Sequence, residues 1–588
     1  MIEQELTGYI TQAFETLYGQ QPEGVKLETT RQDFEGDYTF VVFPYIKISK
    51  KNPEQTATEV GEYIISNTTE VSSFNVVKGF LNLVIADNYW SNFLNAAYNN
   101  SDFGKGIIGK EQKVMVEYSS PNTNKPLHLG HTRNNLLGWS VSEILKANGY
   151  DVYKANLVND RGIHICKSMI AWIKYGNGET PETTNTKGDK LVGKYYVEFE
   201  KYYRAEVKEL IANGIIEADA EKQAPLMIEA QEMLRKWEAH DEETLRIWNM
   251  MNGWVYKGFE ETYNRMGVDF DNYYYESQTY LLGKKFVDEG LAQGVFYKKP
   301  DGSVWIDLTA NGLDEKLVLR ADGTSVYITQ DLGTAQKKYE DVGYDKSIYV
   351  VANEQDYHFK VLKLILQKLG KPYAPGIFHL SYGMVDLPSG KMKSREGTVV
   401  DADELMDEMV QAAKEKTTEL GKTEGFTDAE MNHLYNALGM GALKYFLLKV
   451  DPQKRMLFNP AESIDLHGNT GPFIQYTHAR ICSVMRTFGK IPQPVLVETL
   501  DKFEKELLAL LYTWPSIIIE AGKLYSPAII ANYIYEVAKE FNRLYHELSL
   551  LREVDETIKN NRLAMSQLTA NVIKQGLNIL GIEAVERM

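Results

Sequence analysis

The chain has 588 residues, 25% of them charged and 44% hydrophobic, and its formal net charge at pH 7 is −17. This length predicts several domains of ordinary globular composition, and because we find no apolar run of membrane-spanning length, we expect no contact with a membrane. The only cysteines, Cys166 and Cys482, exclude a disulfide framework and a cysteine zinc site, so we expect a cytoplasmic protein without bound zinc. The negative charge makes a nucleic-acid partner less expected without excluding it, because such binding depends on local basic patches.

Residues 1–106 predict a small N-terminal α/β domain. A helix over 2–18 precedes strand-like segments at 25–30 and 39–46, a helix over 55–66 and a strand-like segment at 76–85. The acidic, amphipathic start differs from a secretory signal, which has a basic region before an apolar one. The aromatic and basic residues of this domain are equally compatible with a binding surface and with a plain accessory domain.

The stretch 113–150 organises the rest of the chain. A short buried strand over 113–120 is interrupted by prolines and asparagines, and a helix with regular apolar spacing begins near Leu129. His128 and His131 therefore flank Gly130 where a loop enters a helix. The free N–H groups and the dipole of a helix start suit a phosphate, and Gly130 permits close approach of a base or phosphate. The alternative is a pair of surface histidines at a helix start.

A second strand over 151–160 completes a strand–helix–strand pattern, which predicts a parallel sheet with ligands beyond the carboxyl ends of its strands. We assign residues 107–405 to this nucleotide-binding α/β domain. Helical periodicity over about 163–296 indicates a helical insertion, most simply with a solvated charged face. Strand character then returns at 294–308, 317–331 and 346–356, followed by a helix over 359–370 and a further strand at 378–387.

A basic loop follows this last strand. Lys391, Lys393 and Arg395 lie within five residues, between Gly390 and Gly397, which suits a clamp over a triphosphate. A solvated basic loop is the alternative for this segment taken by itself. After it, Asp401 and Glu404 fit a capping box. Residues 406–588 are almost entirely helical, as in a helix bundle.

Five stretches of the chain resemble a known family: EYSSPNTNKPLHLGH (117–131), GTSVYITQD (323–331), QDYHF (355–359), NTGPFIQYTHAR (469–480) and LGIEAVERM (580–588). They are similar to the class I aminoacyl-tRNA synthetases and, more closely, to the arginyl-tRNA synthetases. The resemblance covers the whole chain. It implies a Rossmann-like catalytic domain with a helical insertion, an N-terminal domain that contacts tRNA, and an all-helical anticodon-binding domain over 406–588.

The resemblance also implies site residues. The catalytic set is His128, His131, Lys125 and Lys391, and the further ATP-binding residues are Asn122, Gly130, Met392, Lys393 and Ser394. The sequence departs from the family's KMSKS pattern, because Ser394 stands where its second lysine is expected. Lys125 is the usual candidate to supply that charge in arginyl enzymes.

The implied arginine-binding residues are Glu117, Asn122, Tyr327, Asp331 and Gln355. This set makes chemical sense, because a guanidinium is a planar cation with five donors, best met by carboxylates. For Tyr327 and Asp331, a strand end with a capping aspartate is the alternative. The implied tRNA-binding residues are Tyr476, His478 and Arg480, which are equally compatible with holding the bundle together.

The reaction that the resemblance implies is activation of L-arginine by ATP with Mg²⁺, followed by transfer from arginyl-adenylate to the terminal ribose of tRNA(Arg), with tRNA required for activation. We expect a monomer with no DNA partner and no metal site built from protein side chains. Three other interpretations stay open: another class I synthetase, a non-catalytic RNA-binding relative, and a small nucleotidyltransferase, which would lack the long helical C-terminal region.

Overall fold

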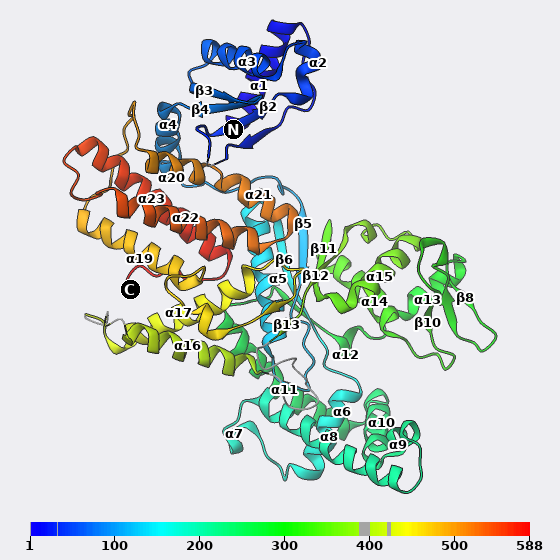
Figure 1. Ribbon diagram of the computed structural model, residues 1–588. Helices are drawn as coiled ribbons and strands as arrows, with labels where there is room; N and C mark the ends of the chain where they lie inside the picture. Colours follow the sequence, from blue (N-terminus) through cyan, green and yellow to red (C-terminus); the bar gives the residue numbers. More distant parts are fainter. Residues whose placement is uncertain (1, 32, 387–399, 420, 422–424) are drawn as a thin grey trace. The chain divides into compact units, whose positions relative to one another are not determined.

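The structure is a computed structural model that describes residues 2–31, 33–386, 400–419, 421 and 425–588. Its contacts group the chain into two compact units (Figure 1). Unit 1 comprises Met1–Phe103, Ile481–Trp514 and Val537–Val572, and unit 2 comprises Gly104–Arg480, Pro515–Glu536 and Ile573–Met588. The chain after residue 480 thus contributes to both units, whereas the predicted domains 1–106, 107–405 and 406–588 are consecutive.

Unit 1 begins with an antiparallel sheet of order β1-β2-β4-β3, covered by helices. The predicted strand over 39–46 stops at Val41, because Pro44 lies in a short 3-10 helix, η1 (Phe43–Tyr45). The predicted strand over 76–85 is a hairpin that turns at Lys78 and Gly79, both with positive φ. The elements are α1 (Ile2–Tyr18), β1 (Leu27–Thr29), β2 (Tyr38–Val41), α2 (Ile46–Ser49), α3 (Pro53–Asn67), β3 (Val71–Val77), β4 (Phe80–Ile85) and α4 (Asp87–Tyr98).

Unit 2 contains the predicted parallel sheet, which has five strands in the order β12-β11-β5-β6-β7. All four strand pairs are parallel, and α5 (Leu129–Ala147) connects β5 to β6. The central strands are buried, as expected for a sheet covered on both faces. The strands are β5 (Lys113–Glu117), β6 (Asp151–Val158), β7 (Asn272–Tyr275), β11 (Lys346–Ala352) and β12 (Ile377–Tyr382).

The helical insertion is shorter than predicted. Its last helix ends at Met266, and β7 then joins the main sheet instead of continuing the helical region to residue 296. The helices are α6 (Ile163–Tyr175), α7 (Pro181–Thr184), α8 (Gly188–Ala212), α9 (Glu217–Gln223), α10 (Pro225–Glu238) and α11 (Glu242–Met266), followed after β7 by α12 (Glu276–Thr279) and α13 (Lys284–Ala292).

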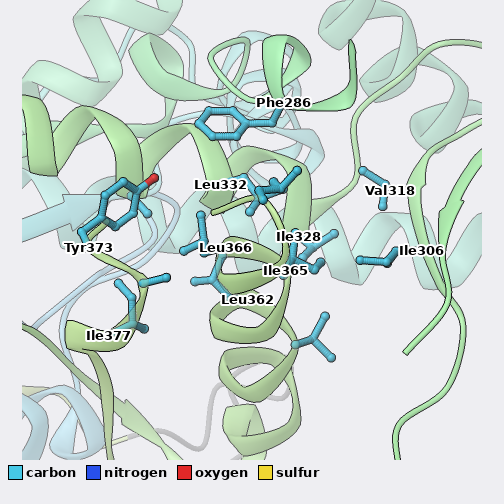
Figure 2. Packing of buried hydrophobic residues seen from close by; sticks show 14 of the residues in the cluster. Phe286, Ile306, Val318, Ile328, Leu332, Leu362, Ile365, Leu366, Tyr373 and Ile377 are labelled. Carbon is cyan, nitrogen blue, oxygen red and sulfur yellow. The ribbon is translucent and has the colours of Figure 1, made fainter. Parts of the chain in front are cut away.

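The region after α13 forms a small antiparallel sheet of its own, β10-β9-β8, instead of extending the parallel sheet. The predicted strand over 317–331 is wrong in its second half, because β10 ends at Leu319 and a helix starts at Tyr327. Figure 2 shows the core of this region, where Phe286, Leu332 and Leu366 pack from three helices. The elements are β8 (Tyr297–Lys298), β9 (Val304–Ile306), η2 (Thr309–Asn311), β10 (Lys316–Leu319), α14 (Tyr327–Val342), η3 (Asn353–Gln355), α15 (Asp356–Lys368) and η4 (Ala374–Gly376).

The remaining chain is helical, as predicted, apart from a two-residue parallel pair between β13 (Val385–Asp386) and β14 (Met456–Leu457). Asp401 Oδ1 accepts from the backbone N of Asp403 at 2.8 Å and of Glu404 at 3.1 Å, which is one half of the predicted capping box, while Glu404 Oε1 accepts from Lys190 Nζ at 3.1 Å. The helices are α16 (Ala402–Glu419), α17 (Asp428–Leu448), α18 (Pro460–Ser463), α19 (Gly471–Phe488), α20 (Lys502–Tyr512), α21 (Trp514–Leu524), α22 (Pro527–Glu547) and α23 (Glu556–Ile579).

One stretch, Lys502–Leu524, is long and apolar enough to cross a membrane by length and composition, so the expectation that no apolar run reaches this length is wrong. It consists of α20 and α21, and Leu507, Leu508 and Leu511 of its first half are fully buried. Buried core helices commonly satisfy the same criterion, so this stretch is weak evidence for a membrane span.

Candidate active site

The two histidines of the HLGH stretch cap the start of α5 reciprocally. The backbone N of Gly130 donates to Nδ1 of His128 at 3.1 Å, and the backbone N of His128 donates to Nδ1 of His131 at 3.2 Å. The ring centroids lie 3.9 Å apart. The prediction of a histidine pair at a helix start is therefore confirmed, and the rings are fixed by the backbone of the same turn.

These hydrogen bonds determine the protonation of both rings. An Nδ1 that accepts a hydrogen bond carries no proton, so a neutral ring bears its proton on Nε2. Burial and the nearby positive charge of Lys125 lower the pKa of His128 to about 3. Burial, with the neighbouring His128, lowers the pKa of His131 well below its ordinary value. Each ring is thus a neutral imidazole that offers one Nε2–H donor at the start of α5.

The loop between β5 and α5 reverses direction through two residues with positive φ, Ser119 and Ser120. Such a conformation is unfavourable for residues other than glycine, and here two asparagines compensate. The side chain of Asn134 accepts from the backbone N of Ser119 at 2.5 Å, and that of Asn156 accepts from Ser120 at 3.2 Å.

The predicted ligands Asn122 and Lys125 lie further along this loop. Asn122 is exposed and forms a parallel bridge with Asn159, at the carboxyl end of β6. Lys125 is half-buried, and burial lowers its pKa. Both residues therefore lie at the carboxyl edge of the sheet, where the sequence analysis placed the ligand site.

The chain that follows the predicted basic loop pairs directly with the HLGH stretch. The backbone N of Leu129 donates to Val400 O at 3.1 Å, and the backbone N of Ala402 donates to Leu127 O at 2.9 Å, around an antiparallel bridge between His128 and Asp401. The predicted ATP ligands Lys391, Met392, Lys393 and Ser394 lie outside the described residues, so their roles stay predictions.

Glu117, a predicted arginine ligand, is the last residue of β5 and is only 4% exposed. Its Oε2 forms an ion pair with the ammonium of Lys338 on α14, which is 1% exposed. The Lys338 Nζ also lies 5.1 Å from the centroid of the Tyr349 ring. The negative charge of Glu117 is therefore balanced within the protein.

Asp331 and Tyr327 begin α14, so the alternative of a strand end with a capping aspartate is wrong. Asp331 Oδ2 lies 2.6 Å from His358 Nε2, which brings α14 against the segment that contains Gln355. Tyr327 is 77% exposed, and Gln355 is exposed as well. Burial and Tyr344, and after them Glu117 and Asp331, raise the pKa of Tyr349 well above its ordinary value.

Of the predicted tRNA-binding residues, His478 is only 3% exposed and its Nδ1 lies 2.9 Å from Val585 O. This contact supports the alternative that His478 holds the bundle together. Tyr476 and Arg480 lie one turn apart on α19 and are half-buried, with the guanidinium 4.7 Å from the tyrosine ring centroid. For these two residues the tRNA contact stays a prediction.

Sequence reasoning missed several polar residues near the site. Lys338 follows Asp331 by seven residues on α14, a spacing that puts both on one helix face. Glu276, which begins α12 after β7, has its pKa raised to about 7 by burial and by the nearby Asp160 and Asp331, although Arg161 opposes the shift. A cavity of about 490 Å³ opens beside it, lined by Asp160, Trp237, His240, Leu245, Trp248, Asn249, Tyr256, Tyr275, Ser277, Gln278, Tyr280 and Leu281.

Within the described part of the chain, no group of three or more histidine, cysteine or acidic side chains could hold a metal ion. The site around α5 instead offers N–H donors and Lys125. Such a donor set fits phosphate oxygens and does not fit a divalent cation directly.

Comparison with known proteins covers the whole chain. The family described as "tRNA synthetases class I (R), catalytic domain" matches residues 95–459, "Arginyl tRNA synthetase N terminal domain" matches 4–85, and "DALR anticodon binding domain" matches 474–588. The arginine–tRNA ligase of Parabacteroides distasonis is 55% identical, with 100% of both chains covered. That of Amoebophilus asiaticus is 57% identical over 96% of both.

Solved structures agree in fold. The arginyl-tRNA synthetase of Thermus thermophilus matches with a TM-score of 0.79 at 22% identity, covering 100% of both chains. The enzyme of Plasmodium falciparum matches with a TM-score of 0.77 at 19% identity, covering 100% of this chain and 99% of its own.

Proposed function

The chain belongs to the arginyl-tRNA synthetases, and from this premise we propose how its residues carry out the reaction of an arginine–tRNA ligase. The enzyme uses ATP to activate L-arginine and then esterifies tRNA(Arg). The observation that carries the proposal is the reciprocal cap of His128 and His131, which fixes two neutral N–H donors at the start of α5.

In the activation step, a carboxylate oxygen of arginine attacks the α-phosphorus of ATP and pyrophosphate leaves. Negative charge grows on the phosphate oxygens, and the Nε2–H groups of His128 and His131 stabilise it. The ammonium of Lys125 adds a positive charge close by, and Asn122 orients the reacting groups. Neutral donors fixed in advance suit this role, because they need no reorganisation as the charge develops.

Lys391 supplies a second cation for the phosphates, and Met392, Lys393 and Ser394 contribute to the ATP site. This assignment rests on the resemblance to the family's second signature, which Lys391 and Met392 match and from which Lys393 and Ser394 depart. Gly130 lets the nucleotide approach the first turn of α5 closely. Mg²⁺ would neutralise the triphosphate and be held mainly by phosphate and water oxygens, in keeping with the donor-rich site.

The arginine-binding residues form the amino-acid end of the site, which recognises the guanidinium of the substrate arginine. Asp331 offers a carboxylate, and Tyr327 and Gln355 offer exposed polar atoms on neighbouring segments. Because Glu117 is paired with Lys338, the pair adds oriented oxygen atoms with little net charge. Asp331 therefore provides most of the negative charge that arginine meets.

In the transfer step, the 2′-hydroxyl of the terminal ribose of tRNA attacks the adenylate carbonyl, and AMP leaves. Tyr476 and Arg480 contact the anticodon side of the tRNA, the tyrosine by stacking and the arginine through phosphate. The N-terminal domain contributes a further tRNA contact. We expect a cytoplasmic enzyme that acts as a monomer.

The test is ATP–pyrophosphate exchange with each amino acid, with and without tRNA. We expect exchange with arginine alone, and only when tRNA is present. His131→Ala should lower it, whereas the matched change His433→Ala, at a largely exposed histidine, should not. Exchange with another amino acid would contradict the assigned pocket, and absence of exchange under every condition would favour a non-catalytic relative.

A further inference from the structure

Arg133 lies on α5 two residues after His131, and neither the sequence motifs nor the proposed reaction uses it. It is fully buried, at 0% exposure. Its guanidinium forms no ion pair with any described residue and instead donates to four backbone carbonyls. Burial lowers its pKa to about 10, which still leaves it charged at neutral pH.

The four carbonyls belong to two segments far along the chain. Nη1 donates to Gly383 O at 2.5 Å and to Lys454 O at 3.0 Å. Nη2 donates to Asp451 O at 3.3 Å and to Pro452 O at 3.4 Å. A buried cation that bonds only to carbonyls costs desolvation energy, and its specific effect is to fix the backbone that it contacts.

The backbone that Arg133 contacts comprises Gly383, in the junction between β12 and β13, and residues 451–454 in the loop after α17. Gly383 N donates to Pro452 O at 2.9 Å, and Phe458 N donates to Asp386 O at 2.9 Å, so this junction is joined to the loop after α17. No side chain fits at Gly383, since an added Cβ would lie 2.5 Å from the carbonyl carbon of Lys454. The Gly383 junction is therefore held by the Arg133 guanidinium and by the loop after α17.

The next residue of α5 adds to this attachment. Asn134 Nδ2 donates to Val350 O at 2.7 Å and to the Tyr382 hydroxyl at 3.2 Å, while its Oδ1 accepts from Ser119 N. Arg133 and Asn134 thus connect α5 to β5, β11 and β12 where these strands end. The first turns of α5 are fastened to the edge of the sheet that holds the site.

The same turn of α5 also receives the chain after residue 399. Val400 and Ala402 pair with Leu129 and Leu127 through the bridge described above. Two described segments, one before and one after residues 387–399, are therefore attached to the helix that carries His128 and His131. The first attachment is made by a side chain, that of Arg133.

We infer that Arg133 is a positioning residue for amino-acid activation, which holds the Gly383 junction and the start of α5 in the relative position that ATP requires. The inference rests on the proposed role of His128 and His131 in binding the phosphates. Loss of Arg133 should impair the use of ATP and not the binding of arginine, because the arginine-binding residues lie on other elements.

The experiment compares Arg133→Met and Arg133→Lys with the natural enzyme in ATP–pyrophosphate exchange at saturating tRNA. Arg133→Met should lower kcat/KM for ATP by about 100-fold, as a displacement of about 1 Å does, and change the KM for arginine by less than about twofold. The kcat/KM for ATP of Arg133→Lys should be about tenfold higher than that of Arg133→Met, because an ammonium still donates to carbonyls.

Two further variants separate positioning from general stability. Asn148→Ala removes a buried side chain at the other end of α5, where Asn148 Nδ2 donates to the carbonyls of Ile144 and Ile518 at 2.9 Å. This control should lower the melting temperature and leave the KM for ATP unchanged. Gly383→Ala displaces the junction while keeping Arg133, and it should reproduce the loss in kcat/KM for ATP.

Folded Arg133 variants with the natural kcat/KM for ATP would overturn the inference. Equal losses for ATP and arginine, matched by Asn148→Ala, would overturn it too. If Arg133→Met does not fold, the kcat/KM values of Arg133→Lys and Gly383→Ala for ATP decide whether the inference holds. When these variants are unaffected but His131→Ala is impaired, only this inference fails; when His131→Ala is also unaffected, the proposed function of the histidines fails.

Discussion

The proposed phosphate-binding and arginine-binding ends of the site differ in how their side chains are held. At the phosphate end, His128 and His131 are neutral and owe their orientation to backbone N–H groups of the same helix turn. At the amino-acid end, Glu117 pairs with Lys338 and Asp331 contacts His358, both partners coming from elsewhere in the chain. Local hydrogen bonds therefore suffice to orient the neutral donors, whereas the two carboxylates, buried Glu117 and partly exposed Asp331, are each paired with a side chain from another element.

Breaking the buried ion pair should have the largest effect. Lys338→Met leaves Glu117 buried without its cation, and we expect a loss of about 3–5 kcal/mol in the free energy of unfolding, measured by urea denaturation. The double change Glu117→Gln with Lys338→Met should recover most of it. Lys337→Met, at an exposed lysine of the same helix, should cost less than about 1 kcal/mol. If Lys338→Met lowers the free energy of unfolding as little as Lys337→Met does, the buried ion pair does not contribute to stability.

The next effect is catalytic and belongs to the phosphate end. His131→Ala should raise the activation barrier for adenylate formation by about 3 kcal/mol, which corresponds to roughly a hundredfold lower rate, because one preorganised donor is lost. Single-turnover formation of arginyl-adenylate in the presence of tRNA measures it. An unaltered rate would refute the role of His131.

At the amino-acid end, Asp331→Asn should weaken arginine binding by about 2 kcal/mol, since a charged hydrogen bond becomes a neutral one. We expect the KM for arginine to rise roughly 30-fold while the KM for ATP stays the same. The control is Asp341→Asn on the same helix, where the aspartate pairs with exposed Lys337. Equal increases in both KM values would mean that the two ends are not separate.

The smallest effect concerns pH. The pKa of His128 is lowered to about 3 in the folded protein, whereas an unfolded histidine titrates near 6.5. Between these two pH values the unfolded chain therefore binds more protons than the folded protein does. Stability is therefore complete above about pH 6.5 and declines as the pH falls towards the folded value. We expect the stability of His128→Asn to fall less than that of the natural protein, by roughly 1 kcal/mol at about pH 5.5, because asparagine does not titrate. Identical pH profiles from urea denaturation would contradict the depressed pKa values.

The sequence predicted what depends on neighbours along the chain. The strand predicted over 113–120, which the structure has over 113–117, the helix from Leu129 and the histidines at its start follow from local pattern and capping chemistry. The basic loop, predicted from its composition, lies outside the described residues.

Contacts between residues that are distant along the chain could not be predicted from the local sequence pattern. The pattern around Tyr327 favoured a strand, because Val326, Tyr327 and Ile328 are β-branched or aromatic, yet packing against Val318 and Leu362 makes this segment the first turn of α14. No feature of the sequence distinguishes Lys338 from the other lysines. Only the fold reveals that it lies opposite Glu117.

The bridge between His128 and Asp401 also has a consequence for biosynthesis. The two residues are roughly 270 positions apart, so at about 5–20 residues per second the ribosome adds the second one some 14 to 55 s after the first. During this interval the HLGH helix can form, but the strand segment that lies against it does not yet exist. A nascent chain therefore carries an incomplete nucleotide site until its first four hundred residues have emerged, and chaperones that act on this enzyme would meet it in that state.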